Sequence, residues 1–194
     1  MKFFLVLVLI FNCLLGFSQT FFLKTGPFKI QEYSRQEKQL KSEPVRDSVQ
    51  YYYSSEPDLE QPLIYARINI NFPIKPVVKY FFSLPDSLVR HINISIEANN
   101  SSGNTFQTGN WDNGNVIDSF NKQYNIFKTE LVNLFGPSYP LQELTQKEFQ
   151  GTIYWERYDQ WENSNLDSQL YMMLDKKKKI FRIRAEINFK PFKK

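Results

Sequence analysis

The residues best suited to catalysis are two carboxylates in an aromatic stretch near the C-terminus. Glu156 and Asp159 lie close in the chain to Trp155, Tyr158 and Trp161. A pair of carboxylic acids is sufficient for glycosidic bond hydrolysis. Trp and Tyr rings also offer apolar faces on which sugar rings can stack. The stretch therefore suggests a carboxylate-based glycan hydrolase. The alternative is that Trp155 packs in the core and the acids are solvated.

Other catalytic schemes find few suitable residues in this sequence. His91 is the only histidine, so a Ser-His-Asp arrangement would have to use it. Strand alternation places His91 beside Asn93 and Ser95 on a polar face, where we expect it to be solvated. The sequence has one cysteine, Cys13, and it has no HExxH zinc motif or glycine-rich phosphate loop. We therefore expect no metal site, no cofactor and, unless the two carboxylates act, no enzymatic activity.

Aromatic and basic residues are the candidates for binding a partner. Trp111 lies in a polar stretch, residues 99–115, and together with Trp155 and Trp161 it could contact a ligand. Residues 176–194 contain nine Lys or Arg and one acid, which suits lipid headgroups or an acidic polysaccharide. The basic candidates are Lys176, Lys177, Lys178, Lys179, Arg182 and Arg184. The alternative is a basic turn followed by a solvated strand face.

Nucleic acid is not an expected partner. Phe181 and Phe189, the aromatic residues on the predicted strand of this basic segment, point inward if the strand alternates. The net charge of the chain is only +4.

The N-terminus has the pattern of a cleavable secretory signal peptide. Lys2 precedes an apolar stretch, residues 3–15, which is shorter than the ~20 residues that a membrane-spanning helix needs. Gly16 and Ser18 are small residues at the −3 and −1 positions of a cut after Ser18. We expect a signal peptide at residues 1–18 and a mature domain at 19–194. That domain would be exported to the periplasm or cell exterior, with no cysteine and no transmembrane segment.

The clearest secondary-structure pattern predicts an α-helix over residues 116–135. Its apolar residues recur at three- and four-residue steps, as on one face of a helix. They are Val116, Phe120, Tyr124, Phe127, Leu131, Leu134 and Phe135. Asn115 can cap the start, and Gly136 followed by Pro137 ends the pattern.

Strand patterns lie on both sides of this helix. They cover residues 48–54, 63–72, 77–84, 88–98, 149–158, 169–174 and 179–189. Alternation puts Arg67 and Val89 on polar faces, and the charged segment 34–43 is either a short exposed helix or a loop. Strands in series favour antiparallel pairing. We therefore predict a single α+β domain, in which one long amphipathic helix packs on a mostly antiparallel sheet of six to eight strands. Residues 99–115 would form a long polar loop.

The chain resembles the small uncharacterised exported proteins of Gram-negative bacteria, and it matches no characterised family. The resemblance rests on the signal ending Gly16-Phe17-Ser18-Gln19, on a Lys/Asn/Ile/Phe-rich composition and on the helix end Leu131-x-x-Leu134-Phe135-Gly136-Pro137. It covers about a third of the chain and implies no reaction.

Three functions therefore remain open at the level of sequence. The first is a non-catalytic binding or accessory domain whose partner is another exported protein, a glycan or an anionic surface. The second is a glycan hydrolase using Glu156 and Asp159. The third is an anionic-surface binder that uses the basic C-terminal residues.

Overall fold

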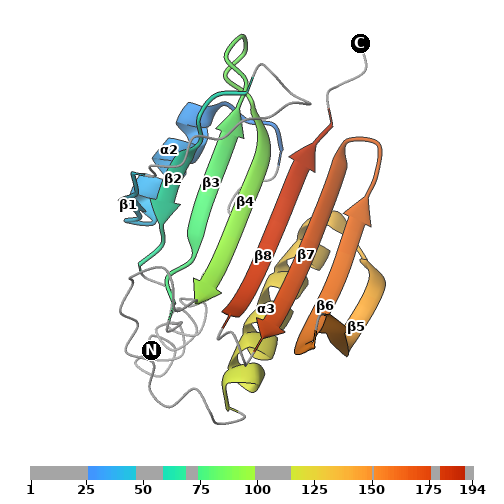
Figure 1. The fold of residues 1–194 in the computed structure, drawn as a ribbon. Coiled ribbons are helices and arrows are strands. Elements are labelled where there is room, and N and C mark those ends of the chain that lie inside the picture. Colours follow the sequence, from blue (N-terminus) through green and yellow to red (C-terminus); the bar gives the residue numbers. More distant parts are fainter. Residues whose placement is uncertain are drawn as a thin grey trace, which may run out of the picture.

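A computed structural model describes residues 26–46, 59–68, 74–98, 115–149, 151–175 and 180–190 (Figure 1). The signal peptide, the strand over 48–54 and nearly all of the loop over 99–115 are predictions that lie outside these residues. The elements, in chain order, are α2 (Ile30–Gln39), β1 (Glu43–Pro44), β2 (Leu63–Ala66), β3 (Val77–Phe82), β4 (Val89–Ala98), α3 (Asn115–Phe135), β5 (Tyr139–Phe149), β6 (Thr152–Glu162), β7 (Leu166–Asp175) and β8 (Ile180–Phe189).

The strands form one antiparallel sheet of eight, in the order β1-β2-β3-β4-β8-β7-β6-β5. This confirms the α+β class and the mostly antiparallel sheet of six to eight strands. Within the described residues the same sequence of elements occurs twice, a helix followed by four strands. The strand order is mirrored about the central pair β4 and β8, which runs from His91 opposite Asn188 to Ala98 opposite Phe181.

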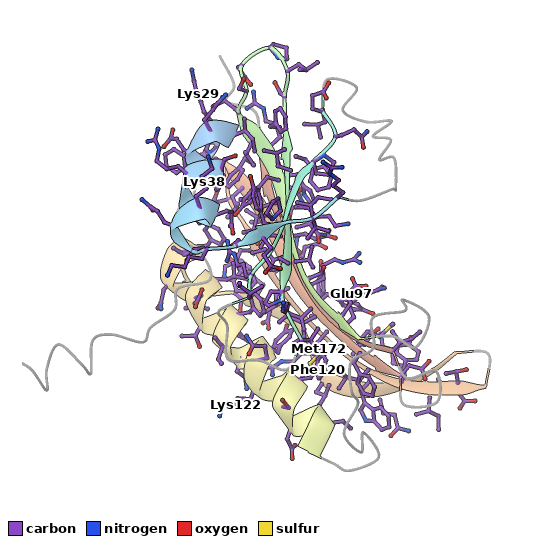
Figure 2. All side chains as sticks on the ribbon, turned by 90° about the vertical axis from the view of Figure 1, so that its left-hand side faces the viewer. Lys29, Lys38, Glu97, Phe120, Lys122 and Met172 are labelled. Atoms are coloured by element: carbon purple, nitrogen blue, oxygen red, sulfur yellow. The ribbon has the colours of Figure 1, made fainter. Side chains whose placement is uncertain are left out.

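Both helices lie on the same side of the sheet (Figures 1 and 2). The helix α2 packs on β3, and α3 packs on β7 and β8. Of the two alternatives for the charged segment 34–43, the helix is the correct one, but it begins earlier and is not exposed throughout: α2 forms from Ile30 to Gln39 and packs on the sheet. Its buried positions include only two apolar residues, Ile30 and Tyr33, and the others are the polar Gln36 and Glu37. Hydrophobic periodicity therefore carried little signal for this helix.

The core lies between the helices and the sheet. Phe120, Tyr124, Phe127 and Leu131 of α3 are buried there. Strand β8 alternates cleanly: its buried residues are Phe181, Ile183, Ala185, Ile187 and Phe189. Strand β7 alternates in the same way from Leu166 to Leu174. Each strand therefore has one side in the core and one side facing away from the helices.

Several strand details differ from the sequence prediction. Arg67 and Val89 are both buried, although alternation put them on polar faces. Val89 changes side because the register between β3 and β4 shifts at Phe81 and Phe82. The edge strand β5 was not predicted, since its polar sequence lacks an apolar alternation. No helix in the described ranges is long and apolar enough to span a bilayer.

Candidate binding site

Asp159 is buried between the sheet and α3. Its carboxylate accepts hydrogen bonds from Tyr124 Oη at 2.7 Å, Lys128 Nζ at 2.7 Å and Ser138 Oγ at 3.0 Å. The side chain is 1% exposed. Burial and the bond to Asp159 raise the pKa of the Tyr124 phenol, which stays protonated and donates. Asp159 therefore fastens α3 to β6, and a substrate could not reach it without displacing the helix.

Glu156 lies on the opposite side of the same strand. It pairs with Lys147 of β5, and its hydrogen bond raises the pKa of that lysine. Residues three apart in a strand point to opposite faces. The structure therefore does not bring Glu156 and Asp159 together, and their arrangement is not that of two carboxylates flanking one scissile bond.

The predicted aromatic contact residues also separate. Trp161 is 2% exposed, and its Nε1 donates to the carbonyl of Gly136 at 2.9 Å, which ties the end of α3 to β6. Trp155 is half-buried and packs against the core. Trp111 lies outside the described residues. The two predicted tryptophans that the structure describes therefore both pack on the side of the sheet that the helices cover.

The described part of the basic patch is paired with acid. Arg184 Nη2 donates to Glu97 Oε1 at 2.7 Å, and Arg182 Nη2 donates to Glu97 Oε2 at 3.1 Å. Burial alone would raise the pKa of Glu97, but the bonds and charges of the two arginines outweigh it and lower that pKa. The lysines at 176–179 lie outside the described residues. Arg182 and Arg184 are therefore held by a carboxylate of the neighbouring strand, which sequence spacing could not show.

A second buried ionic cluster joins α2 to the sheet. Glu37 accepts hydrogen bonds from Arg67 Nη2 at 2.6 Å, Tyr80 Oη at 2.5 Å and Ser42 Oγ at 2.5 Å. Glu37 is fully buried and Arg67 is 4% exposed. Burial would raise the pKa of Glu37, but the bond and charge of Arg67, with the two hydroxyls, lower it. A charged residue every few positions in residues 34–43 gave no sign that one of them is buried.

The side of the sheet away from the helices is polar and half-buried over β4, β8, β7 and β6, and this part is here called the open face; on the neighbouring β3, Phe81 lies on the same side opposite His91 and is buried. Figure 2 shows the difference: Phe120 and Met172 lie between α3 and the sheet, whereas Glu97 lies beyond it. The open face is made by alternate residues of four adjacent strands. They are Tyr154, Glu156, Tyr158 and Gln160 of β6; Asp167, Gln169, Tyr171 and Met173 of β7; Arg182, Arg184, Glu186 and Asn188 of β8; and His91, Asn93, Ser95 and Glu97 of β4. Every one of these side chains is partly accessible.

His91 belongs to this face and is less solvated than expected. Its Nδ1 lies 2.5 Å from Asn188 Oδ1, and its ring lies 5.0 Å from that of Phe81. The histidine thus bridges β4 to β8 and stacks toward β3. It is held as part of the surface and does not stand free in solvent.

Three tyrosines gather at one end of the open face, and we call them the tyrosine platform: Tyr154, Tyr158 and Tyr171. Tyr158 and Tyr171 are directly opposite in β6 and β7, and Arg184 is opposite Tyr171 in β8. Burial raises the pKa of Tyr171, as do the nearby Glu156 and Tyr154, although Arg182 and Arg184 oppose this. Burial raises the pKa of Tyr158 as well. The phenols of Tyr158 and Tyr171 therefore remain neutral donors at physiological pH.

Sequence reasoning missed this platform because its members lie in different predicted strands. The register of β6 against β7 brings Tyr158 and Tyr171 together, and that register depends on the turn at residues 163–165. The prediction placed residues 161–167 in a loop, whereas β6 extends to Glu162 and β7 begins at Leu166. Counting the alternation of both strands to their true ends would have found the pair.

One hollow surface among the described residues is on the outer side of α3. A shallow depression of about 630 Å³ is lined by residues of that helix alone, among them Asp118, Asn125 and Asn133. It contains none of the predicted site residues. Among the described residues, no group of three His, Cys, Asp or Glu side chains is placed to hold a metal ion.

No family model, curated protein or solved structure matches this chain. The fold and the side-chain geometry above are therefore the basis for the functional argument.

Proposed function

We propose that the chain is an exported, non-catalytic binding domain of the periplasm or cell exterior, and that it binds through the open face. In this proposal α3 is the long amphipathic helix that covers the other face. The observation that carries the proposal is the contrast between the two sides of the sheet. One side is closed by two helices, and the other presents fifteen polar side chains and Met173 in rows, all partly accessible.

The state of the open face favours binding. Cross-strand pairs such as Glu97 with Arg182 and Arg184 hold the side chains in place before any ligand arrives. A surface whose side chains are already ordered loses less conformational entropy on association. Tyr, Met and Arg, which are enriched in protein interfaces, all occur on this face.

The placement of the acids gives less support to hydrolysis. Glu156 is paired with Lys147 on the open face, while Asp159 is enclosed by three donors on the other side. A hydrolase would need a second acid near Glu156. Turnover of a glycan that is abolished by Glu156→Gln, with the fold intact, would overturn the non-catalytic proposal.

The surface that binds can be tested with single-cysteine labels, because the expected mature chain contains no cysteine. Gln169→Cys places an environment-sensitive fluorophore on the open face, and Asn133→Cys places the same dye on the outer side of α3. Each labelled mature chain is titrated with a solubilised cell-envelope fraction of a Gram-negative bacterium. We expect a saturable fluorescence change for the Gln169 label and little for the Asn133 label.

A response of the Asn133 label alone would move the binding surface to α3 and contradict the proposal. A response of neither label would contradict it too. Export is tested separately, by expressing the full chain in a Gram-negative host and measuring the mass of the periplasmic or secreted product. The expected mass is that of residues 19–194.

A further inference from the structure

We propose that the tyrosine platform binds a neutral, hydroxyl-rich glycan. This inference rests on the proposed function, since it names the ligand class of the same open face. Tyr154 and Tyr158 are four residues apart on one side of β6, a separation of ~13 Å along the strand. Tyr171 lies opposite Tyr158. The platform is therefore longer than one sugar ring, and it offers more than one aromatic face.

The hydrogen-bonding groups of the platform are available. Among the described residues, the hydroxyls of Tyr154, Tyr158 and Tyr171 have no hydrogen-bond partner. Gln169 and Gln160 are opposite each other one row further along the same strands. Phenol and amide groups both donate and accept, as the hydroxyls of a sugar do. Phenol rings add the apolar faces that the C–H side of a pyranose needs.

The charges around the platform argue against a ligand held by its own charge. Arg182 and Arg184 both pair with Glu97, and Lys147 pairs with Glu156. Arg184 also lies 3.8 Å from Glu186. A phosphate, sulfate or anionic lipid would have to displace a carboxylate that already occupies each arginine. Hydrogen bonding and ring stacking remain as the chemistry that the platform offers.

The test is affinity electrophoresis of the mature chain in native gels that contain a dissolved polysaccharide. The neutral probes are a β-linked glucan, a xylan, a mannan and dextran, and the anionic comparison is alginate. We expect at least one neutral glycan to retard the protein. Tyr171→Ala and Tyr158→Ala should each weaken the affinity about tenfold. Tyr171→Phe, which keeps the ring, should lose less.

Ile126→Ala is the control, because Ile126 is a 40% exposed apolar residue on the outer side of α3, away from the open face. Its retardation should equal that of the wild type. Circular dichroism of each variant checks that the fold is kept.

Several results would overturn the inference. They are retardation by alginate alone, no retardation in any gel, and equal losses of affinity for Ile126→Ala and Tyr171→Ala. A concentration-dependent dimer that Tyr171→Ala abolishes, seen by sedimentation without any retardation, would make the platform a protein interface instead. If the Gln169 label still responds to the envelope fraction while every gel is negative, the glycan inference is rejected. The proposal that the open face binds a partner is then retained. If reducing ends appear in the gels, the non-catalytic proposal fails.

Discussion

The buried pair of Glu37 and Arg67 allows a quantitative prediction about stability. Arg67→Met removes the guanidinium but keeps a side chain of similar length. The carboxylate of Glu37 then stays fully buried with only the hydroxyls of Tyr80 and Ser42 as donors. Breaking one partner of a buried ion pair costs about 3–5 kcal/mol, because the other charge loses its compensation. Such a loss is a large part of the ~5–15 kcal/mol that a folded domain has in total.

Urea unfolding measures this loss, with tryptophan fluorescence as the signal, since Trp161 is buried in the fold. With a dependence of about 2 kcal/mol per molar urea, the midpoint should fall by about 1.5–2.5 M. The double variant Glu37→Met/Arg67→Met is the control, because it removes both charges. It should be at least about 2 kcal/mol more stable than Arg67→Met.

The same pair predicts how the difference in unfolding free energy between the wild type and Arg67→Met depends on pH. In the wild type the pKa of Glu37 is lowered, so its stabilisation is present above the carboxyl pKa of the unfolded chain and is lost as pH falls through the lowered pKa. In Arg67→Met, burial acts without the arginine and raises that pKa, so the penalty is present at neutral pH and is relieved by acid. The gap between the two proteins should therefore narrow as pH falls. A gap that is constant with pH, or a double variant less stable than Arg67→Met, would refute this reasoning.

Three further predictions follow from single contacts. Asp159→Ala should destabilise the protein by about 3 kcal/mol, because Lys128 and Tyr124 lose their hydrogen-bond acceptor. Urea unfolding measures this loss, and a loss below about 1 kcal/mol would show that Asp159 does not hold α3 on the sheet. Gly136→Ala should lower the free energy of unfolding by about 1–2 kcal/mol in the same assay. The backbone φ there is +86° and a Cβ would meet no atom within 4 Å, so backbone strain is the only expected effect. An unchanged urea midpoint would contradict this. Glu97→Gln should change stability by less than about 1 kcal/mol, because the pair is partly exposed, yet strengthen binding to phosphatidylserine vesicles at low salt by about 1 kcal/mol. Equal vesicle binding of Glu97→Gln and the wild type would show that this carboxylate does not mask the arginines.

Much of the architecture was predictable because several elements bury regular apolar stripes. Strand β8 alternates from Phe181 to Phe189, and its register in the sheet follows from that pattern. The packing of α2 on the sheet and the existence of the strand β5 could not be predicted, for the opposite reason. Helix α2 is held by Glu37, which is buried only because Arg67 of another segment meets it. Strand β5 lies at the sheet edge, where few of its side chains need to be apolar.

The candidate site was harder to predict than the fold. Glu156 and Asp159 looked like a pair in sequence, but three positions along a strand place them on opposite faces. Arg182 and Arg184 looked like free cations until β4 supplied Glu97 from more than eighty residues away. The tyrosine platform depends on how β6 and β7 align. Each of these relations is set by strand pairing, which local composition does not encode.

Hydroxyl-radical footprinting of the unlabelled residues 19–194, the expected mature chain, tests the open face most directly. Mass spectrometry compares the oxidation rates of individual side chains with and without the solubilised cell-envelope fraction. Tyr158 and Tyr171 report on the open face, and the exposed Ile126 on the outer side of α3 is the internal control within the same molecule. The account predicts that Tyr158 and Tyr171 are protected while Ile126 keeps its rate. Protection of Ile126 with unchanged rates at Tyr158 and Tyr171 would contradict it.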